Sequence, residues 1–180
     1  MNQTAHGLDV RLVIYKRIVE GDLSKFTATS NITQSGGGAR DLRFSPAEEF
    51  FSAFRRMFAQ DADGVLRGQF SWGNHAPTDA EIHPPTNSRP NEVRIGRIHE
   101  CFPQSVVPKD SPDCVLLIVL DNAGRVSPYF TSLRSLKNDN WHPAIKAPII
   151  KGLTAQRNAN TTAMGYVDVE SGRHYTNGSI

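Results

Sequence analysis

The sequence predicts a single, mainly β (α+β) domain of the barrel or sandwich type with two helices. Short apolar or alternating segments of strand length recur along the chain, and Gly, Pro, Asn or Asp separate them. Only two longer segments have helical features. With 180 residues and no repeat, low-complexity tract or long linker, the chain suits one domain (residues 1–180) with a core over about residues 9–176.

The first half contains three predicted strands. Asp9–Glu20 is rich in β-branched residues and alternates well enough for a strand, with a helix as the competing interpretation. A second strand over Phe26–Ser30 leads into a loop over residues 31–38 that holds three consecutive glycines. Leu42–Phe44 follows as a short third strand.

A helix is predicted to begin at Ser45, which is a suitable N-cap, with Pro46 in the first helical position and two acids in the first turn. Arg55 and Arg56 should point outward. Four phenylalanines at helical spacing form the apolar face and are expected in the core, namely Phe50, Phe51, Phe54 and Phe58.

After this helix the pattern is again β. Five further strands are predicted over Leu66–Trp72, Ala80–His83, Val93–His99, Cys114–Leu120 and Val126–Phe130. The turn Asp121–Gly124 joins the last two in a hairpin. Thr131–Leu136 suits a short helix, and Pro143–Leu153 a second main helix that Pro148 interrupts. A final hairpin around a Ser-Gly turn joins Met164–Glu170 and Arg173–Tyr175.

Composition limits the classes of partner. The net charge is only +2, so affinity for nucleic acid must come from local clusters rather than from a global basic field. Cys101 and Cys114 are too few for a disulfide framework and have no metal-ligand spacing. No run reaches membrane-spanning length and the N-terminus lacks a signal peptide, which predicts a soluble, cytoplasmic protein without a membrane partner.

Residues 87–100 combine arginine, amide and carboxylate side chains in a mixture typical of base-reading elements. The arginines Arg89, Arg94 and Arg97 suit phosphate oxygens and guanine edges. Asn91 can pair with adenine, and Glu92 can accept from a cytosine amine. The alternative is an exposed loop and strand with scattered surface charge.

The glycine run suits a close approach of backbone N–H groups to a phosphate, with Ser35, Arg40 and Arg43 as further donors. The alternative is a hairpin loop without a ligand, and neither a P-loop nor a dinucleotide fingerprint is present. In the later segment, strand alternation places Arg94 and Arg97 on opposite faces. If both meet DNA, we expect an irregularity at Gly96.

Two segments resemble the DNA-contacting arms of the N-terminal effector domain of the EcoRII restriction endonuclease. The segment Asn31–Pro46 resembles the first arm and Asn91–Arg97 the second, and a weaker resemblance covers about residues 10–135. It implies a seven-stranded open pseudobarrel of plant B-three type with two helices, whose arms grip the major groove. Residues on arm positions are Asn31, Thr33, Gly37, Gly38, Asn91, Glu92, Arg94 and Arg97.

The sequence departs from the EcoRII pattern at two positions that the resemblance assigns to recognition. Ala39-Arg40 replaces a His-Gln pair, and Ile98 replaces a Trp. The EcoRII target sequence is therefore not expected here.

Catalytic motifs are absent, so we predict no catalytic residues, no metal and no cofactor in this chain. The predicted function is sequence-specific binding of double-stranded DNA, as the recognition module of a restriction endonuclease or as a stand-alone relative. As part of an endonuclease, the chain would have a nuclease domain or subunit as its partner. One alternative is a magnesium-dependent nuclease using Glu100, Asp113 and Asp121. The other is a module whose arginines bind an acidic protein or a nucleotide.

Overall fold

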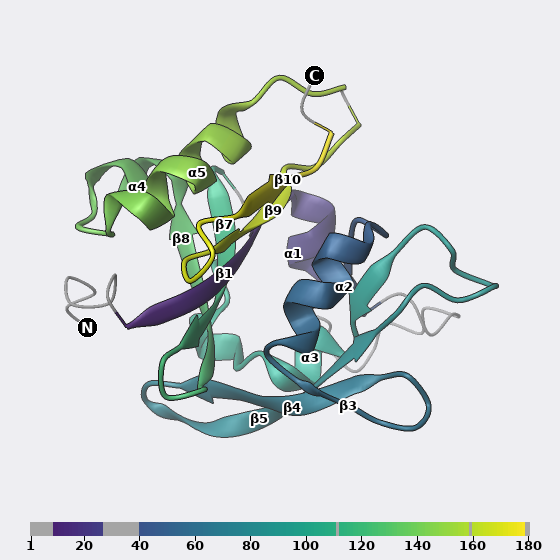
Figure 1. Cartoon of the computed structure of the whole chain (residues 1–180). Coiled ribbons are helices and arrows are strands. Elements are labelled where there is room, and N and C mark those ends of the chain that lie inside the picture. The colour runs from purple at the N-terminus through teal and green to yellow at the C-terminus, as the bar shows by residue number, and fades with distance from the viewer. Residues whose placement is uncertain (1–8, 27–39, 111, 159, 179–180) are drawn as a thin grey trace. The chain divides into compact units, whose positions relative to one another are not determined.

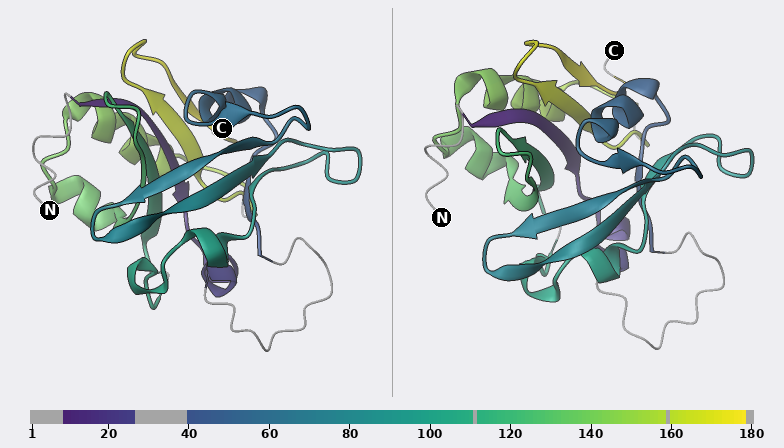
Figure 2. Two further views of the ribbon diagram at one scale, coloured as in Figure 1. Left: turned by 90° about the horizontal axis from the view of Figure 1, so that it is seen from below. Right: turned by 60° about the horizontal axis from the view of Figure 1, so that its bottom comes forward.

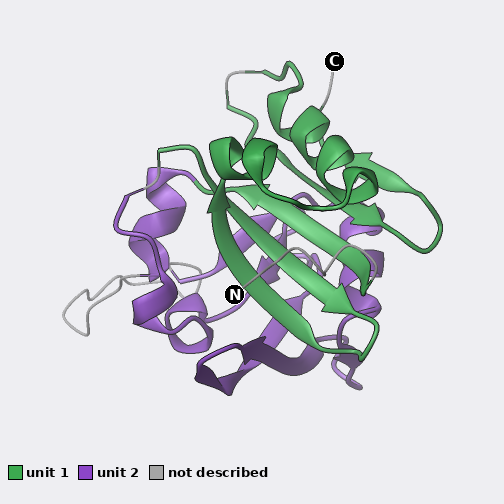
Figure 3. Cartoon of the chain, turned by 90° about the vertical axis from the view of Figure 1, so that its left-hand side faces the viewer, with its two compact units in different colours: residues 1–18, 112–180 green, residues 19–111 purple. Residues whose placement is uncertain are grey.

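The computed structural model describes residues 9–26, 40–110, 112–158 and 160–178 (Figure 1). The chain divides into two compact units, which we call unit 1 (residues 1–18 and 112–180) and unit 2 (residues 19–111) (Figure 3). The structure is mainly β, as expected. Its described residues hold ten strands and five α-helices, more than the seven strands and two helices that the EcoRII resemblance implies. None of these helices has the length and apolar character needed to cross a bilayer.

Unit 1 contains an antiparallel sheet in the order β10-β9-β1-β7-β8. Strand β1 lies between β7 and β9, with Ile14 opposite both Ile118 and Tyr166. The buried run of β7 and the tight turn into β8 confirm the predicted hairpin. The strands are β1 (Val10–Arg17), β7 (Cys114–Asp121), β8 (Val126–Ser132), β9 (Met164–Asp168) and β10 (His174–Thr176).

Helices α4 (Leu133–Asn138) and α5 (Pro143–Thr154) cover one face of this sheet (Figure 1). Ile145 and Ile149 of α5 belong to a core cluster with residues of β1, β7 and β9. The predicted interruption at Pro148 is wrong, because α5 continues through this residue. Packing of the apolar face therefore outweighs the hydrogen bond that proline cannot donate.

Unit 2 is built on the antiparallel order β4-β5-β6-β2, with β3 pairing along β4. Strands β4 and β5 form a long hairpin (Figure 2). The predicted strand Ala80–His83 is the end of a longer β5. The strands are β2 (Leu42–Phe44), β3 (Ala59–Gln60), β4 (Leu66–Trp72), β5 (His75–His83) and β6 (Val93–Ile95).

The core of unit 2 is aromatic. Helix α2 (Glu48–Arg55) buries the phenylalanines predicted for its apolar face, and Phe58 after it is buried as well, while Arg55 and Arg56 are exposed. The rings of Phe54 and Phe44 meet edge to face with centroids 5.3 Å apart, a favoured aromatic geometry. The helix prediction from the sequence is thus confirmed in its packing.

Three local predictions in unit 2 are wrong. Phe26 ends helix α1 (Glu20–Phe26) instead of beginning a strand, and the rest of that predicted strand lies outside the described residues. Helix α2 has Ala47 at the N-cap, while the Ser45 hydroxyl accepts a bond from the Ala47 N–H in the preceding turn (3.3 Å). The strand predicted over Val93–His99 ends at Ile95, and α3 (Ile98–Cys101) follows.

Candidate nucleic-acid interface

Strand pairing in unit 2 brings the two arginine-rich segments of the sequence together. Strand β2, from the end of the first predicted arm, pairs with β6 of the second in antiparallel register. Arg43 lies directly opposite Arg94, and Leu42 opposite Ile95. Beyond the strands, the Ile98 N–H donates to the Arg40 carbonyl (3.0 Å). The described part of the first predicted arm and the second arm are therefore neighbours at one edge of the sheet.

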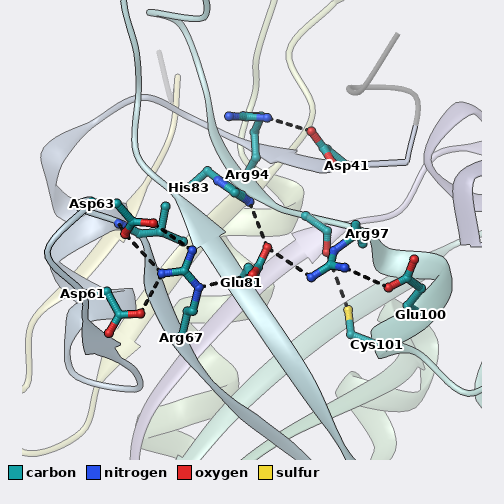
Figure 4. Close-up of polar contacts among 12 residues, drawn as sticks. Asp41, Asp61, Asp63, Arg67, Glu81, His83, Arg94, Arg97, Glu100 and Cys101 are labelled. Carbon is teal, nitrogen blue, oxygen red and sulfur yellow. Dashed lines mark hydrogen bonds and ion pairs between the residues drawn. The ribbon is translucent and has the colours of Figure 1, made fainter. Parts of the chain in front are cut away.

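Alternation along these strands separates the core from a polar face. Leu42, Phe44, Val93 and Ile95 are buried, so the intervening arginines point to the other side. The cross-strand pairs Arg94–His83 and Glu81–Arg67 continue this side over β5 and β4. We call the resulting line of side chains the polar row, which consists of Arg43, Arg94, His83, Glu81 and Arg67; Figure 4 shows most of it.

A buried carboxylate links the two arms. The Asp41 side chain is only 5% exposed, and its Oδ2 accepts from Nη1 of Arg94 (2.8 Å) and from Nη1 of Arg89 (3.1 Å). Arg94 itself is 12% exposed. A buried carboxylate is costly without such charged partners. Arg94 and Arg89 therefore form ion pairs within the protein.

Glu92 provides a second carboxylate among the same arginines. It accepts from Arg43 Nε (2.9 Å), and its other oxygen lies 3.6 Å from Arg94 Nε and 3.9 Å from Arg89 Nη1. The side chain of Glu92 is 13% exposed, whereas that of Arg43 is 56% exposed. We call these residues together with Asp41 the Asp41 cluster; its three arginines and two acids leave one excess positive charge.

Glu81 is the centre of a second group of charges (Figure 4). Its oxygens lie 3.2 Å from Arg67 Nε, 3.4 Å from Arg97 Nη2 and 3.6 Å from His83 Nε2. Arg67 also contacts Asp61 (2.6 Å) and Asp63 (2.8 Å). Its hydrogen bonds to these carboxylates raise the pKa of Arg67 above the ordinary value. Arg67 is therefore engaged within the protein.

Arg97 has a different geometry from the other arginines. Its backbone is left-handed (φ 48°), its side chain is 60% exposed, and it contacts Glu81 and Glu100 (Nη1 to Oε2 3.3 Å). The irregularity expected at Gly96 is present, because β6 has ended and the chain turns into α3. A Cβ on Gly96 would lie 2.8 Å from His83 Nε2. The turn thus places Arg97 against Glu81, which lies on the same side of the sheet as Arg94.

Arg40, at the start of the described part of the first arm, contacts His99 on α3. Its Nη1 lies 2.8 Å from His99 Nε2. Because a guanidinium only donates, Nε2 accepts and the proton of the neutral ring lies on Nδ1. That Nδ1 is buried, and the described residues provide no hydrogen-bond partner for it. Burial, and next the charge of Arg40, lower the pKa of His99.

The remaining predicted DNA-binding residues divide into two groups. Asn91 is exposed in the turn before β6. The others lie outside the described residues, namely Asn31, Thr33, Ser35, Gly37 and Gly38. Sequence reasoning missed Asp41, Glu81 and His83, because their partners are distant in the chain and no local motif marks them.

The acids of the nuclease alternative have partners of their own. Asp113 accepts from the Arg134 N–H (3.1 Å) and lies 3.8 Å from Arg17, and Asp121 contacts Arg125 (2.7 Å). Among the described residues, no group of three or more His, Cys, Asp or Glu side chains is arranged to hold a metal ion. Burial raises the pKa of the Cys101 thiol to about 12, which makes this thiol unreactive.

Comparison of the chain with family models, with curated proteins and with solved structures finds no significant match to any of them.

Proposed function

We propose that this protein binds double-stranded DNA in a sequence-specific manner through two arms in unit 2. The observation that supports this most strongly is the β2–β6 pairing, which aligns Arg43 with Arg94 and joins both arginine-rich segments at one edge. The fold we propose is a B-three-like open pseudobarrel with additional strands. The protein would act as the recognition module of a restriction endonuclease, or as a stand-alone relative, in the cytoplasm.

The exposed residues of the arms are the proposed DNA contacts. Arg97 is more than half exposed, and its two acidic partners orient its guanidinium. Such a fixed fork suits the bidentate contact to a guanine edge. Within the described part of the chain Arg43 has one acidic partner, Glu92, and we assign Arg43 to a backbone phosphate. Asn91 is exposed in the same region and suits an adenine edge.

The arginines bound by Asp41 have a supporting role in this proposal. Arg94 and Arg89 hold the second arm through Asp41 rather than contacting DNA directly. The sequence resemblance adds Asn31, Thr33, Gly37 and Gly38 of the first arm to the proposed interface. Ser35 and Arg40 are proposed as further donors to phosphate beside the glycine run. Glu81, Glu92 and Glu100 offset much of the arginine charge, which disfavours indiscriminate binding to phosphates and favours selective contacts.

A selection from randomised duplexes, followed by sequencing, tests the proposal with the wild-type chain and Arg97→Gly. Glycine accepts the left-handed backbone of residue 97, so this variant removes the guanidinium without disturbing the turn. We expect a short enriched motif in the wild type. In the variant, preference at one base pair should fall by about 1–3 kcal/mol.

Arg125→Gly is the control for this selection. Arg125 follows the β7–β8 turn of unit 1, is 70% exposed and also has an acidic partner. The control should select the same motif as the wild type. If the wild-type chain enriches no motif, sequence-specific recognition is refuted; an unchanged motif with Arg97→Gly would refute the assignment of Arg97.

A further inference from the structure

We propose that Asp41 is a positioning residue that couples the two arms, so that base discrimination depends on a carboxylate that touches no DNA. This inference rests on the proposed DNA-binding function and extends it. With 5% of its side chain exposed, Asp41 is too buried to reach a ligand. Its effect on recognition must pass through the arginines it binds.

The geometry of the contact joins residues far apart in the sequence. One oxygen of Asp41, just before β2, accepts from both Arg89 and Arg94, which flank the start of the second arm. The sequence separations are 48 and 53 residues. A single acceptor shared by two donors fixes both guanidinium groups relative to β2. Movement of one arm therefore requires the other to move or the charged hydrogen bonds to break.

Arg94 depends on this acceptor. Its buried Nε has no hydrogen-bond partner among the described residues, and the nearest Glu92 oxygen is 3.6 Å away. The Asp41 contact at 2.8 Å is thus the short hydrogen bond that the structure gives this side chain. Without the Asp41 carboxylate, the positive charge of Arg94, whose side chain is 12% exposed, would lose most of the negative charge that offsets its burial.

The same carboxylate also keeps β2 against β6. Arg43 and Arg94 lie directly opposite each other, and like charges in this position are destabilising. Glu92 lies between them, and Asp41 neutralises the buried member of the pair. Loss of Asp41 should loosen the short β2–β6 ladder. The exposed Arg43 would then no longer be held at a fixed distance from Arg97.

The inference predicts two opposite effects of Asp41→Asn. Discrimination between the selected duplex and a scrambled duplex should fall about tenfold, because the arms are no longer held in register. Binding to the scrambled duplex should become stronger and its salt slope steeper by about 1, because one negative charge is gone and its arginines are released. A residue that only stabilised the fold would weaken both kinds of binding together.

Two further variants separate position from charge. The double variant Asp41→Asn/Arg94→Gln keeps the net charge of the wild type. Discrimination should therefore still fall, while the salt slope should equal that of the wild type. Because both charges are removed, this variant also contains no unpaired arginine at position 94 that would destabilise the fold. Asp79→Asn is the control, since Asp79 is exposed on β5 and bonded to Gln69. It changes the charge by the same amount and should leave discrimination unchanged.

Hydrogen exchange of the free proteins provides a measurement that needs no DNA. Amides of Leu42–Phe44 and Val93–Ile95 should exchange faster in Asp41→Asn and in the double variant, but not in Asp79→Asn. Unchanged discrimination, or unchanged exchange of these amides, in a folded Asp41→Asn or double variant would overturn the inference. A wild-type protein that does not discriminate between duplexes would instead refute the proposed function. In that case, hydrogen exchange alone would test whether Asp41 couples the two arms.

Discussion

Gly96 illustrates how a single residue shapes the interface. The chain leaves β6 here, and an added Cβ would lie 2.8 Å from His83 Nε2. We expect Gly96→Ala to lower the free energy of unfolding by about 1–3 kcal/mol, because the His83 ring must move out of the polar row. Urea denaturation measures this change.

A second substitution checks the cause of that destabilisation. His83→Ala opens the space that the new methyl group needs, so Gly96→Ala should cost less in this background than in the wild type. Gly21→Ala is the comparison without a steric cost, because a Cβ there meets nothing within 4 Å and alanine is favoured in helix α1. Equal costs of Gly96→Ala in both backgrounds would show that the His83 contact is not the reason.

His99 makes stability depend on pH. Burial and the neighbouring Arg40 lower its pKa below the ordinary 6.5. The unfolded chain therefore binds a proton at a higher pH than the folded protein does, and stability rises with pH between the two pKa values. The contribution of His99 is fully present above pH 6.5 and is lost as the pH falls towards the folded-state pKa.

The NMR titration of the His99 ring should accordingly show a midpoint below 6.5. His99→Gln keeps an acceptor for Arg40 but removes the titration, so its unfolding free energy should vary less between about pH 5 and pH 7 than that of the wild type. A midpoint at or above 6.5, or an unaltered pH dependence in His99→Gln, would contradict this account.

At the scale of elements, Pro148 lies inside α5. Proline in a helix interior costs about 3 kcal/mol, and its rigidity in the unfolded chain offsets up to about 1 kcal/mol of that. We therefore expect Pro148→Ala to raise the free energy of unfolding by about 2 kcal/mol. Pro143→Ala, at the first position of the same helix, should change it by less than about 0.5 kcal/mol. Equal effects of both would contradict the argument.

Elements that follow from local patterns could be predicted from the sequence. The phenylalanine spacing of α2 and the apolar run of β7 each reflect burial of one face, so the predictions agree with the structure. The extended strand over Val93–His99 failed because alternation continues past Gly96, where backbone geometry ends the strand. Similarly, the sequence marks Pro148 as a helix breaker but does not reveal the packing that overrides it.

The candidate site, like the fold, could be predicted from the sequence only in part. Arginines clustered in sequence, such as Arg94 and Arg97, could be identified from composition. Their acidic partners could not, because Asp41 and Glu81 meet them only through strand pairing. The exposed fraction of each arginine could not be predicted either, because no local pattern indicates that the side chain of Arg94 is 12% exposed and that of Arg97 60% exposed.

At the scale of the whole molecule, charge is unevenly divided along the chain. Unit 2 contains ten Lys or Arg and twelve Asp or Glu residues, a net charge of −2, whereas unit 1 contains ten and six, a net charge of +4. The proposed arms therefore belong to the acidic unit. Any affinity they have for DNA depends on a few exposed arginines rather than on a broad positive field.

This distribution predicts a weak dependence of DNA binding on salt. Each phosphate contact contributes about 0.9 to the slope of log affinity against log salt, and few arm arginines are exposed. We expect a slope of magnitude about 2–4 in anisotropy titrations between about 50 and 200 mM salt. Arg43→Gln should reduce it by about 1. Discrimination between duplexes should persist across this range, because contacts to base edges release no condensed counterions.

Lys151→Gln is the comparison for this titration, since Lys151 is exposed on α5 and is not a proposed contact. Its slope should equal that of the wild type. A wild-type slope near 10, together with discrimination that vanishes as salt is added, would mean that binding depends on many phosphates and not on two arms. A shallow slope that Arg43→Gln leaves unchanged would instead remove Arg43 from the phosphate contacts, while the assignment of Arg97 would still depend on the selection experiment.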